Sequence, residues 1–402
     1  MTPFRALRHR NFRLFWMSQL ASVMGTWMQS LALGWLVWRL THSAFWLGIA
    51  GAMPFMPSLF LASIGGVMVD RHTKKKVLLI TQCGMAIQAA ALGLLTVSGA
   101  FRLYQIILLA AVAGVLMAID MPARLAFVRE IVGRDDIDNA IALNSMAFNA
   151  GRIVGPAVAG FLVPLVGEGG CFLINSVSFL PLIGTLLTMS TLEQARPRNR
   201  DSFASQLYQA WAFVRGHSTI YPLMVGLAFY GLFGFTLTVL MPIFADKVLE
   251  VGVRGLGGLM GAMGVGALSG AVVQATMPRQ SARGRIIFQG SIGLAVAFLG
   301  FALSRWFLLS LALLAGAGFA MILMVTSLVT LILDLTPEEL HGRVMGLYTT
   351  SFLGLMPIGT FLAGTLASGI GAPATTALGG VICLLVAILT LRPKPGLPSA
   401  RQ

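Results

Sequence analysis

The stretch FLLSLALLAGAGFAMILMVTSLVTLIL, residues 307–333, has no charged side chain along its whole length. About 20 consecutive apolar residues in a helix are enough to cross the hydrocarbon core of a bilayer. Lipid offers no hydrogen bonds to the backbone, so a segment of this kind must satisfy its own as a helix. The stretch therefore predicts a membrane-spanning helix.

The rest of the chain repeats this pattern. Of 402 residues, 57% are hydrophobic and 10% are charged, whereas an average soluble protein is roughly 25% charged. Working outward from residues 307–333, we predict twelve spans, which cover residues 14–38, 44–69, 77–101, 103–123, 140–166, 170–192, 220–245, 255–277, 286–304, 307–333, 344–370 and 372–391. The predicted fold class is an all-α polytopic membrane protein.

The net charge of +14 follows the predicted topology. With both termini in the cytoplasm, 22 of the 28 Lys and Arg residues lie on the cytoplasmic side, five lie on the other side, and Arg152 lies inside a span. This is the positive-inside asymmetry of membrane proteins. It predicts orientation in a bacterial inner membrane and contact with anionic lipid, and it explains the charge without nucleic acid.

A polar segment, residues 193–218, separates six predicted spans from the next six. We interpret it as a cytoplasmic linker between an N-terminal six-helix bundle, residues 1–192, and a C-terminal one, residues 219–402. Residues 131–140 and 334–343 resemble each other, and each opens the fifth span of its half. Weak internal symmetry of this kind is typical of transporters built from two pseudo-symmetric bundles around a central cavity.

The loop after the second span reads GVMVDRHTKKK, residues 66–76. Gly66, followed by Asp70 and then by basic residues, resembles the loop 2–3 signature of the major facilitator superfamily, although Thr73 stands where a Gly is usual. The resemblance extends to chain length, span number and internal repeat. It implies a secondary transporter with twelve helices in two bundles and a small-molecule substrate.

The same resemblance implies a latch on the cytoplasmic side. Gly66 would allow a neighbouring helix to approach closely, and Asp70 would meet the positive N-terminal end of the eleventh span. Lys74 could then pair with Asp120 on the fourth span. The alternative is that Arg71 and the following lysines are orientation signals alone.

The fourth span runs into a proline between two charged residues. Pro122 predicts a sharp helix stop, and Asp120 and Arg124, four residues apart, share a helix face. With Asn149 and Arg152 downstream, this stretch resembles the branch of the superfamily that contains enterobactin-type siderophore exporters and drug:proton antiporters. The resemblance implies efflux of a small, partly apolar organic compound.

The fifth span contains GRIVGPAVAG, residues 151–160, which resembles the antiporter signature of the superfamily. Its members are Gly151, Arg152, Gly155, Pro156 and Gly160. The eighth span carries a matching row of glycines, namely Gly257, Gly261, Gly266 and Gly270. We predict that spans five and eight pack against each other here and seal the non-cytoplasmic side; ordinary small-residue packing is the alternative.

The first span has polar residues on one helix face, namely Gln19, Ser22, Thr26 and Gln29. We predict that this face, joined by Asn149 and Arg152, lines the substrate cavity, and interhelical hydrogen bonding is the alternative. An Arg at a span centre costs roughly 2.5–3.5 kcal/mol on insertion scales and should have a partner. Arg152 could bind an anionic group of the substrate, or it could brace the protein through Asp120 or backbone carbonyls.

Enzyme chemistry has no support in the sequence. There is no nucleotide-binding loop, no metal-ligand spacing and no nucleophile set, so we expect no cofactor and no metal. If protons drive transport, Asp120 is the candidate carrier, with Arg152 as its modulator. An uptake permease and a lipid or lysolipid transporter of the same fold remain open, a membrane enzyme or receptor is a distant alternative, and a monomer is the family expectation.

Overall fold

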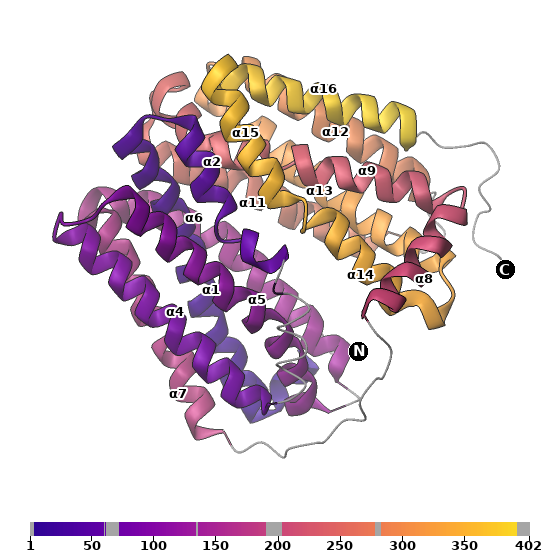
Figure 1. Cartoon of the computed structure of the whole chain (residues 1–402), viewed down its shortest axis with the longest axis horizontal. Coiled ribbons are helices and arrows are strands. Elements are labelled where there is room, and N and C mark those ends of the chain that lie inside the picture. The colour runs from indigo at the N-terminus through magenta and orange to yellow at the C-terminus, as the bar shows by residue number, and fades with distance from the viewer. Residues whose placement is uncertain are drawn as a thin grey trace. The chain divides into compact units, whose positions relative to one another are not determined.

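The computed structural model describes residues 4–59, 61, 72–133, 136–189, 203–277 and 283–391, and the backbone alone for residues 203–208. Helices make up nearly all of this part of the chain, which contains no strand (Figure 1). Ten helical segments within it are long and apolar enough to cross a membrane. One of them, Ile137–Thr188, covers the fifth and sixth predicted spans, and the second predicted span continues into residues outside the described ranges. The all-α polytopic prediction is confirmed.

The chain divides into two compact units. Unit 1 contains Met1–His42 and Met53–Asn199, and unit 2 contains Ser43–Ala52 and Arg200–Gln402. The predicted N-terminal bundle, residues 1–192, differs from unit 1 in two places: unit 1 extends to Asn199, and it leaves out the short segment Ser43–Ala52. That segment forms helix α2, Ala44–Ala52, which packs within unit 2.

Unit 1 is built from long helices joined by short turns. Its elements are η1 (Arg5–Arg8), α1 (Arg10–Thr41), α4 (Lys74–Val97), α5 (Leu103–Val132), α6 (Ile137–Ser178) and α7 (Leu180–Thr188). The backbone of α6 leaves the helical range at Gly167, where φ is 72° and ψ is 173°. Because glycine tolerates a positive φ, the chain breaks there into two spans.

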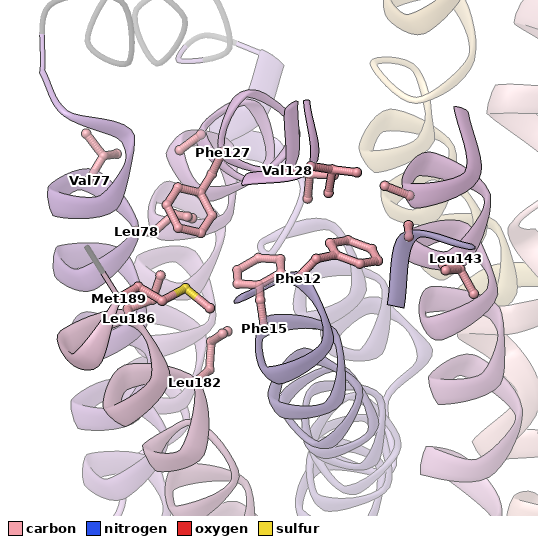
Figure 2. Close-up of a cluster of buried hydrophobic side chains, with 14 residues drawn as sticks. Phe12, Phe15, Val77, Leu78, Phe127, Val128, Leu143, Leu182, Leu186 and Met189 are labelled. Atoms are coloured by element: carbon pink, nitrogen blue, oxygen red, sulfur yellow. The ribbon is translucent and has the colours of Figure 1, made fainter. Parts of the chain in front are cut away.

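A cluster of buried hydrophobic side chains closes one end of unit 1 (Figure 2). Phe12 and Phe15 from the start of α1 lie at its centre, and the ring centroids of Phe15 and Phe127 are 5.3 Å apart. Leu182 and Leu186 of α7 join from another side. The starts of α1, α4 and α6 thus meet the ends of α5 and α7, as expected when successive spans run in opposite directions.

Unit 2 has more and shorter helices. They are α2, α8 (Phe203–Gly216), α9 (Ile220–Phe233), α10 (Thr236–Ile243), η2 (Phe244–Val248), α11 (Gly252–Thr276), α12 (Arg283–Leu303), α13 (Phe307–Leu335), η3 (Glu338–Leu340), α14 (His341–Phe352), α15 (Met356–Ile370) and α16 (Ala372–Thr390). Glycines set the close contacts. A Cβ on Gly48 of α2 would lie 2.7 Å from the Cα of Gly364 on α15, so the two backbones touch.

Candidate functional site

The predicted latch falls partly outside the described residues, since Gly66, Asp70 and Arg71 are not among them. Lys74 opens α4, and its Nζ lies 3.4 Å from a carboxylate oxygen of Glu130, not of Asp120. Both side chains are about seven-eighths buried, at 13% and 14% exposed. The predicted pairing of Lys74 with Asp120 is therefore wrong.

The helix containing Asp120 is longer than predicted, which explains this difference. α5 continues through Pro122 to Val132, so the predicted stop at Pro122 is wrong as well. Proline removes one backbone donor, but the turn beyond it is held by burial of Ala123 and Phe127. The added turns place Glu130 about 15 Å farther along the axis than Asp120, at 1.5 Å per residue. Glu130 is thereby level with the first turn of α4.

Asp120 instead lies in a buried polar network with α4. One carboxylate oxygen accepts hydrogen bonds from Thr81 Oγ1 and Gln82 Nε2, both at 2.8 Å. The other accepts from Arg124 Nε at 3.0 Å and Nη2 at 2.6 Å. The prediction that Asp120 and Arg124 share a helix face is confirmed.

This network bears on proton transfer. Each oxygen of the Asp120 carboxylate already accepts from two donors, so the hydrogen-bonding sites of this side chain are occupied within unit 1. Charge-assisted pairs of this kind are among the strong hydrogen bonds of proteins. The geometry favours a structural ion pair for Asp120 over the proton-carrying role considered above.

The antiporter-like stretch packs on α1. A Cβ on Gly151 would lie 2.6 Å from Val23 Cγ1, and one on Gly155 would lie 2.6 Å from the carbonyl oxygen of Met24. Pro156 and Gly160 are also buried. The backbones of α1 and α6 therefore approach closely, as small residues allow in membrane proteins.

The glycines of the eighth span are also occupied within their own unit. A Cβ on Gly270 would lie 2.8 Å from the carbonyl oxygen of Phe319 on α13, and one on Gly266 would overlap Ala315 of the same helix. Gly151 and Gly155 thus pack two helices of unit 1, and Gly266 and Gly270 pack two helices of unit 2, which is the alternative stated for these glycines. The packing of span five against span eight stays a prediction.

The polar face of α1 is largely used for interhelical hydrogen bonds. Gln29 accepts from Asn175 at 2.8 Å and donates to Gln88 at 3.3 Å, and it is buried among these amides. Gln19 donates to Asn144 Oδ1 and is 2% exposed. These contacts favour the interhelical alternative for both residues over a cavity role.

The remaining cavity candidates divide between buried and partly open positions. Ser22 is buried, and its carbonyl accepts from Thr26 Oγ1 at 2.9 Å. Thr26 and Asn149 are partly exposed, and Asn149 donates to its own helix at Ser145 O, 2.8 Å away. Their side chains therefore make local bonds and leave part of their surface open.

Arg152 has a different environment from the other arginines of unit 1. Its Cζ lies 5.8 Å from the centre of the Trp27 ring, a cation–π contact. Trp27 also meets Phe148 edge-to-face, with ring centroids 5.7 Å apart. Within the described residues Arg152 has no carboxylate or hydrogen-bond partner, so the brace to Asp120 is not what holds it.

Sequence reasoning missed Glu168. This residue follows the Gly167 break and is 6% exposed, and it forms a forked pair with Arg39 at 2.9 Å and 3.1 Å. The signal was an acid within a Gly-Glu-Gly-Gly run between two apolar stretches, which reads as a loop. Arg39 lies at the end of α1, where a cation also complements the helix dipole.

The helix arrangement matches solved structures of transporters. A bacterial homolog of the human lysosomal transporter Spinster has a TM-score of 0.72 at 14% identity, over 96% of this chain and 95% of that one. The nucleoside transporter NupG has a TM-score of 0.74 at 13% identity, over 94% of this chain and 98% of that one. The chain therefore has the fold of these solved structures, as the sequence predicted.

The family within this class is also clear. The sequence matches the family described as transmembrane secretion effector over residues 1–400, and the chain belongs to it. Enterobactin exporter EntS of Shigella boydii serotype 18 is 25% identical over 389 residues, which are 95% of this chain and 91% of that protein. EntS of Escherichia coli O1:K1 is 24% identical over the same extent. The protein is a multi-pass membrane transporter and not an enzyme.

Proposed function

We propose that this protein exports a small, partly apolar organic compound of the siderophore or drug type across the bacterial inner membrane. The observation that carries the proposal is the similarity to enterobactin exporters over 95% of the chain, at 25% identity. Membership of a secretion family points to the same direction of transport. Export proceeds by alternating access, in which one bundle rocks against the other around a central site.

The test is efflux from cells that lack their main exporters, with and without this protein. The panel contains siderophores, macrolides and lipophilic dyes, and expression in the membrane is checked in parallel. Efflux of at least one compound that depends on the protein supports the proposal. Accumulation of a compound instead indicates an uptake permease, and movement of lysolipid alone indicates a lipid transporter; either result contradicts export of siderophore- or drug-like compounds.

Proton coupling is part of the proposal. A protonophore added during efflux should stop transport when protons drive it. Asp120→Asn then separates the two roles of Asp120, because the amide keeps its size and can still accept hydrogen bonds but cannot carry a proton. Coupled efflux that survives this change excludes Asp120 as the carrier and fits the saturated network around it.

The latch remains a proposal for the loop after the second span. Asp70→Asn should reduce efflux while leaving the amount of protein in the membrane unchanged, because the carboxylate would no longer meet a helix N-terminus. Lys74 contributes through Glu130, the partner seen in the structure. Normal efflux by Asp70→Asn argues that the basic residues of this loop act as orientation signals.

The proposed orientation puts both termini in the cytoplasm and the protein, as a monomer, in contact with anionic lipid. Support comes from the distribution of basic residues, 22 of 28 on the cytoplasmic side. Fusion of a periplasm-dependent phosphatase to the C-terminus should give an inactive reporter, and fusion after Arg305 an active one. The reverse pattern contradicts the topology.

A further inference from the structure

Arg39, Arg124 and Arg152 are three of the arginines on the membrane-spanning helices of unit 1, and of these three only Arg152 has no acidic partner among the described residues. Arg124 contacts Asp120, and Arg39 contacts Glu168. Arg152 makes neither an ion pair nor a hydrogen bond within the described residues. A guanidinium carries five N–H donors, and away from water unpaired donors are costly. Unlike Arg39 and Arg124, Arg152 therefore has donors available for a ligand from outside the chain.

Arg152 lies at the middle of its span. It is 15 residues after the start of α6 and 15 residues before the break at Gly167. At this depth lipid contact is strongly unfavourable for a charged group, and intramembrane charges mark substrate or ion pathways. The side chain is partly exposed, so its unpaired donors are not sealed inside unit 1.

One aromatic ring contacts the guanidinium, and a second ring contacts the first. Phe148 and Arg152 are one helical turn apart on α6, and both contact the ring of Trp27 on α1. The Phe148 side chain is 40% exposed, so one of its faces is open for a further ring. Cation, indole and phenyl ring together form one surface, which we call the Arg152–Trp27 surface.

We infer that the Arg152–Trp27 surface binds the anionic group of a planar aromatic compound, such as an aromatic carboxylate. The inference rests on the proposed export function and specifies the chemical class of its substrate. A carboxylate takes two parallel hydrogen bonds from a guanidinium, while the attached ring packs on Phe148 and Trp27 in an offset or edge-to-face arrangement. A simple inorganic anion lacks the contacts with the rings, and an uncharged aromatic lacks the charge-assisted pair with Arg152.

The test uses two probes of nearly the same shape, 1-naphthoate and its uncharged analogue 1-naphthamide. Binding to the purified full-length protein in lipid nanodiscs is measured by equilibrium dialysis. We expect the wild-type protein to bind naphthoate more tightly. Arg152→Gln should weaken naphthoate binding by about 10-fold to 100-fold, the range for a charge-assisted hydrogen bond, and change naphthamide binding less than about 2-fold.

Two further variants separate charge from ring. Arg152→Lys keeps the positive charge, so it should retain the preference for naphthoate at reduced affinity. Trp27→Leu should weaken both probes by about 2-fold to 10-fold, the range for an aromatic contact. Arg305→Gln removes an exposed arginine outside this surface and is the matched control, which should bind both probes as the wild type does.

Three results overturn the inference: equal affinity of the wild type for both probes, no binding of naphthoate, or equal loss of both probes in Arg152→Gln. The last identifies Arg152 as a brace for the fold. Because dialysis needs no transport, these results are independent of the efflux assay. Efflux without naphthoate binding rejects this surface and leaves export intact, and naphthoate binding without efflux rejects export and leaves the surface intact.

Discussion

The two units join the ends of corresponding helices in the same way but hold the middles of these helices together differently. In unit 1, Lys74 at the start of α4 pairs with Glu130 near the end of α5 at 3.4 Å. In unit 2, Arg283 at the start of α12 pairs with Asp334 near the end of α13 at 3.0 Å. The ends of the third and fourth spans of each half are thus joined by the same kind of contact, as the internal repeat predicts.

The middles of these helices differ. Seven and eight residues after the basic partner, unit 1 has Thr81 and Gln82 where unit 2 has Gly290 and Ser291. Ten and six residues before the acidic partner, unit 1 has Asp120 and Arg124 where unit 2 has Met324 and Leu328.

Each set holds its pair of helices together by a different kind of contact. The four polar side chains of unit 1 bind one another, whereas a Cβ on Gly290 would lie 3.1 Å from the Cβ of Met324 and Leu328 is fully buried. Lipid supplies no hydrophobic force between helices, so either hydrogen bonds or close packing can hold two helices together. The fold therefore does not require charged residues at the middle of these helix pairs.

The largest expected effect comes from removing one member of the polar network. Asp120→Leu leaves the Arg124 guanidinium without its partner among buried groups, which should lower the free energy of unfolding by about 3–5 kcal/mol. Thermal unfolding of the purified protein in detergent measures it. A loss below about 1 kcal/mol would show that Arg124 reaches water or lipid headgroups instead.

Replacing the four polar residues of unit 1 by their counterparts in unit 2 tests whether the polar network and the apolar packing stabilise the helix pair equally. The variant with Thr81→Gly, Gln82→Ser, Asp120→Met and Arg124→Leu should be more stable than Asp120→Leu alone, since replacing a whole buried polar set by apolar residues is often neutral. Equal or greater instability would mean that the helices of unit 1 cannot approach as those of unit 2 do.

The next effect concerns the close packing of unit 2. A Cβ at Gly266 overlaps the backbone of Ala315, so Gly266→Ala should destabilise the protein by about 1–3 kcal/mol through overpacking. Gly316→Ala is the control, because a Cβ there meets nothing within 4 Å. The same unfolding assay should place the control within about 0.5 kcal/mol of the wild type. Similar values for both variants would deny that α11 and α13 depend on this contact.

A smaller effect is expected at the two ion pairs. Lys74→Met should cost up to about 1 kcal/mol and Arg283→Met less, because the carboxylate of Asp334 is 53% exposed and that of Glu130 only 14%. High salt should widen the difference between the two losses, because it screens the more exposed pair of Arg283 and Asp334 more strongly. Unfolding at low and high salt checks this, and a larger loss for Arg283→Met would contradict it.

The smallest expected effect is at the N-terminus, outside the spans. His9 and Arg5 donate to Asp136, and these contacts lower the pKa of that carboxyl below its ordinary value. A lowered pKa gives stability that is present above the ordinary value of about 3.9 and is lost as the pH falls further.

Asp136→Asn should therefore speed hydrogen exchange of residues 4–15 at neutral pH. The variant and the wild type should converge once the pH falls below the lowered pKa of Asp136, where this carboxyl is protonated in both the folded and the unfolded protein. Residues 336–341 of unit 2 are the internal reference, because His341 there bonds to backbone carbonyls that do not titrate. Equal exchange in the variant and the wild type at neutral pH would instead assign the tether to Asn139, which accepts from the backbone N–H of Ala6.

Sequence reasoning predicted the fold well because lipid imposes a strong constraint on composition. Apolar length and the scarcity of charge identify spans without any knowledge of packing. Pro122 shows the limit of this reasoning. A proline predicts the end of a helix, but α5 continues past Pro122 because the residues beyond it are packed against other helices. The partner of Lys74 was missed for the same reason, because Glu130 was assigned to a loop.

The candidate site was predicted less completely. Periodicity placed Gln19 and Gln29 on one face of a helix, but it does not say which neighbour that face meets, and both bind other amides inside unit 1. The glycines of spans five and eight raised the same ambiguity. Arg152 was recognised because a charge at a span centre is rare, whereas its contact with Trp27 depends on the rotation of α1 about its own axis.

The position of helix α2 affects what happens when the chain is expressed as two separate polypeptides. It lies early in the chain but packs in unit 2, with Gly48 against Gly364. A gene cut between the codons for Met189 and Phe203 would give two polypeptides, the first of which presents α2 as an arm complementary to the second. We expect the two halves to associate when they are expressed together, because α2 of the first half packs against α15 of the second. Without the other half, each would leave this contact unmade. The packing of α2 in unit 2 therefore links the first half of the chain physically to the second.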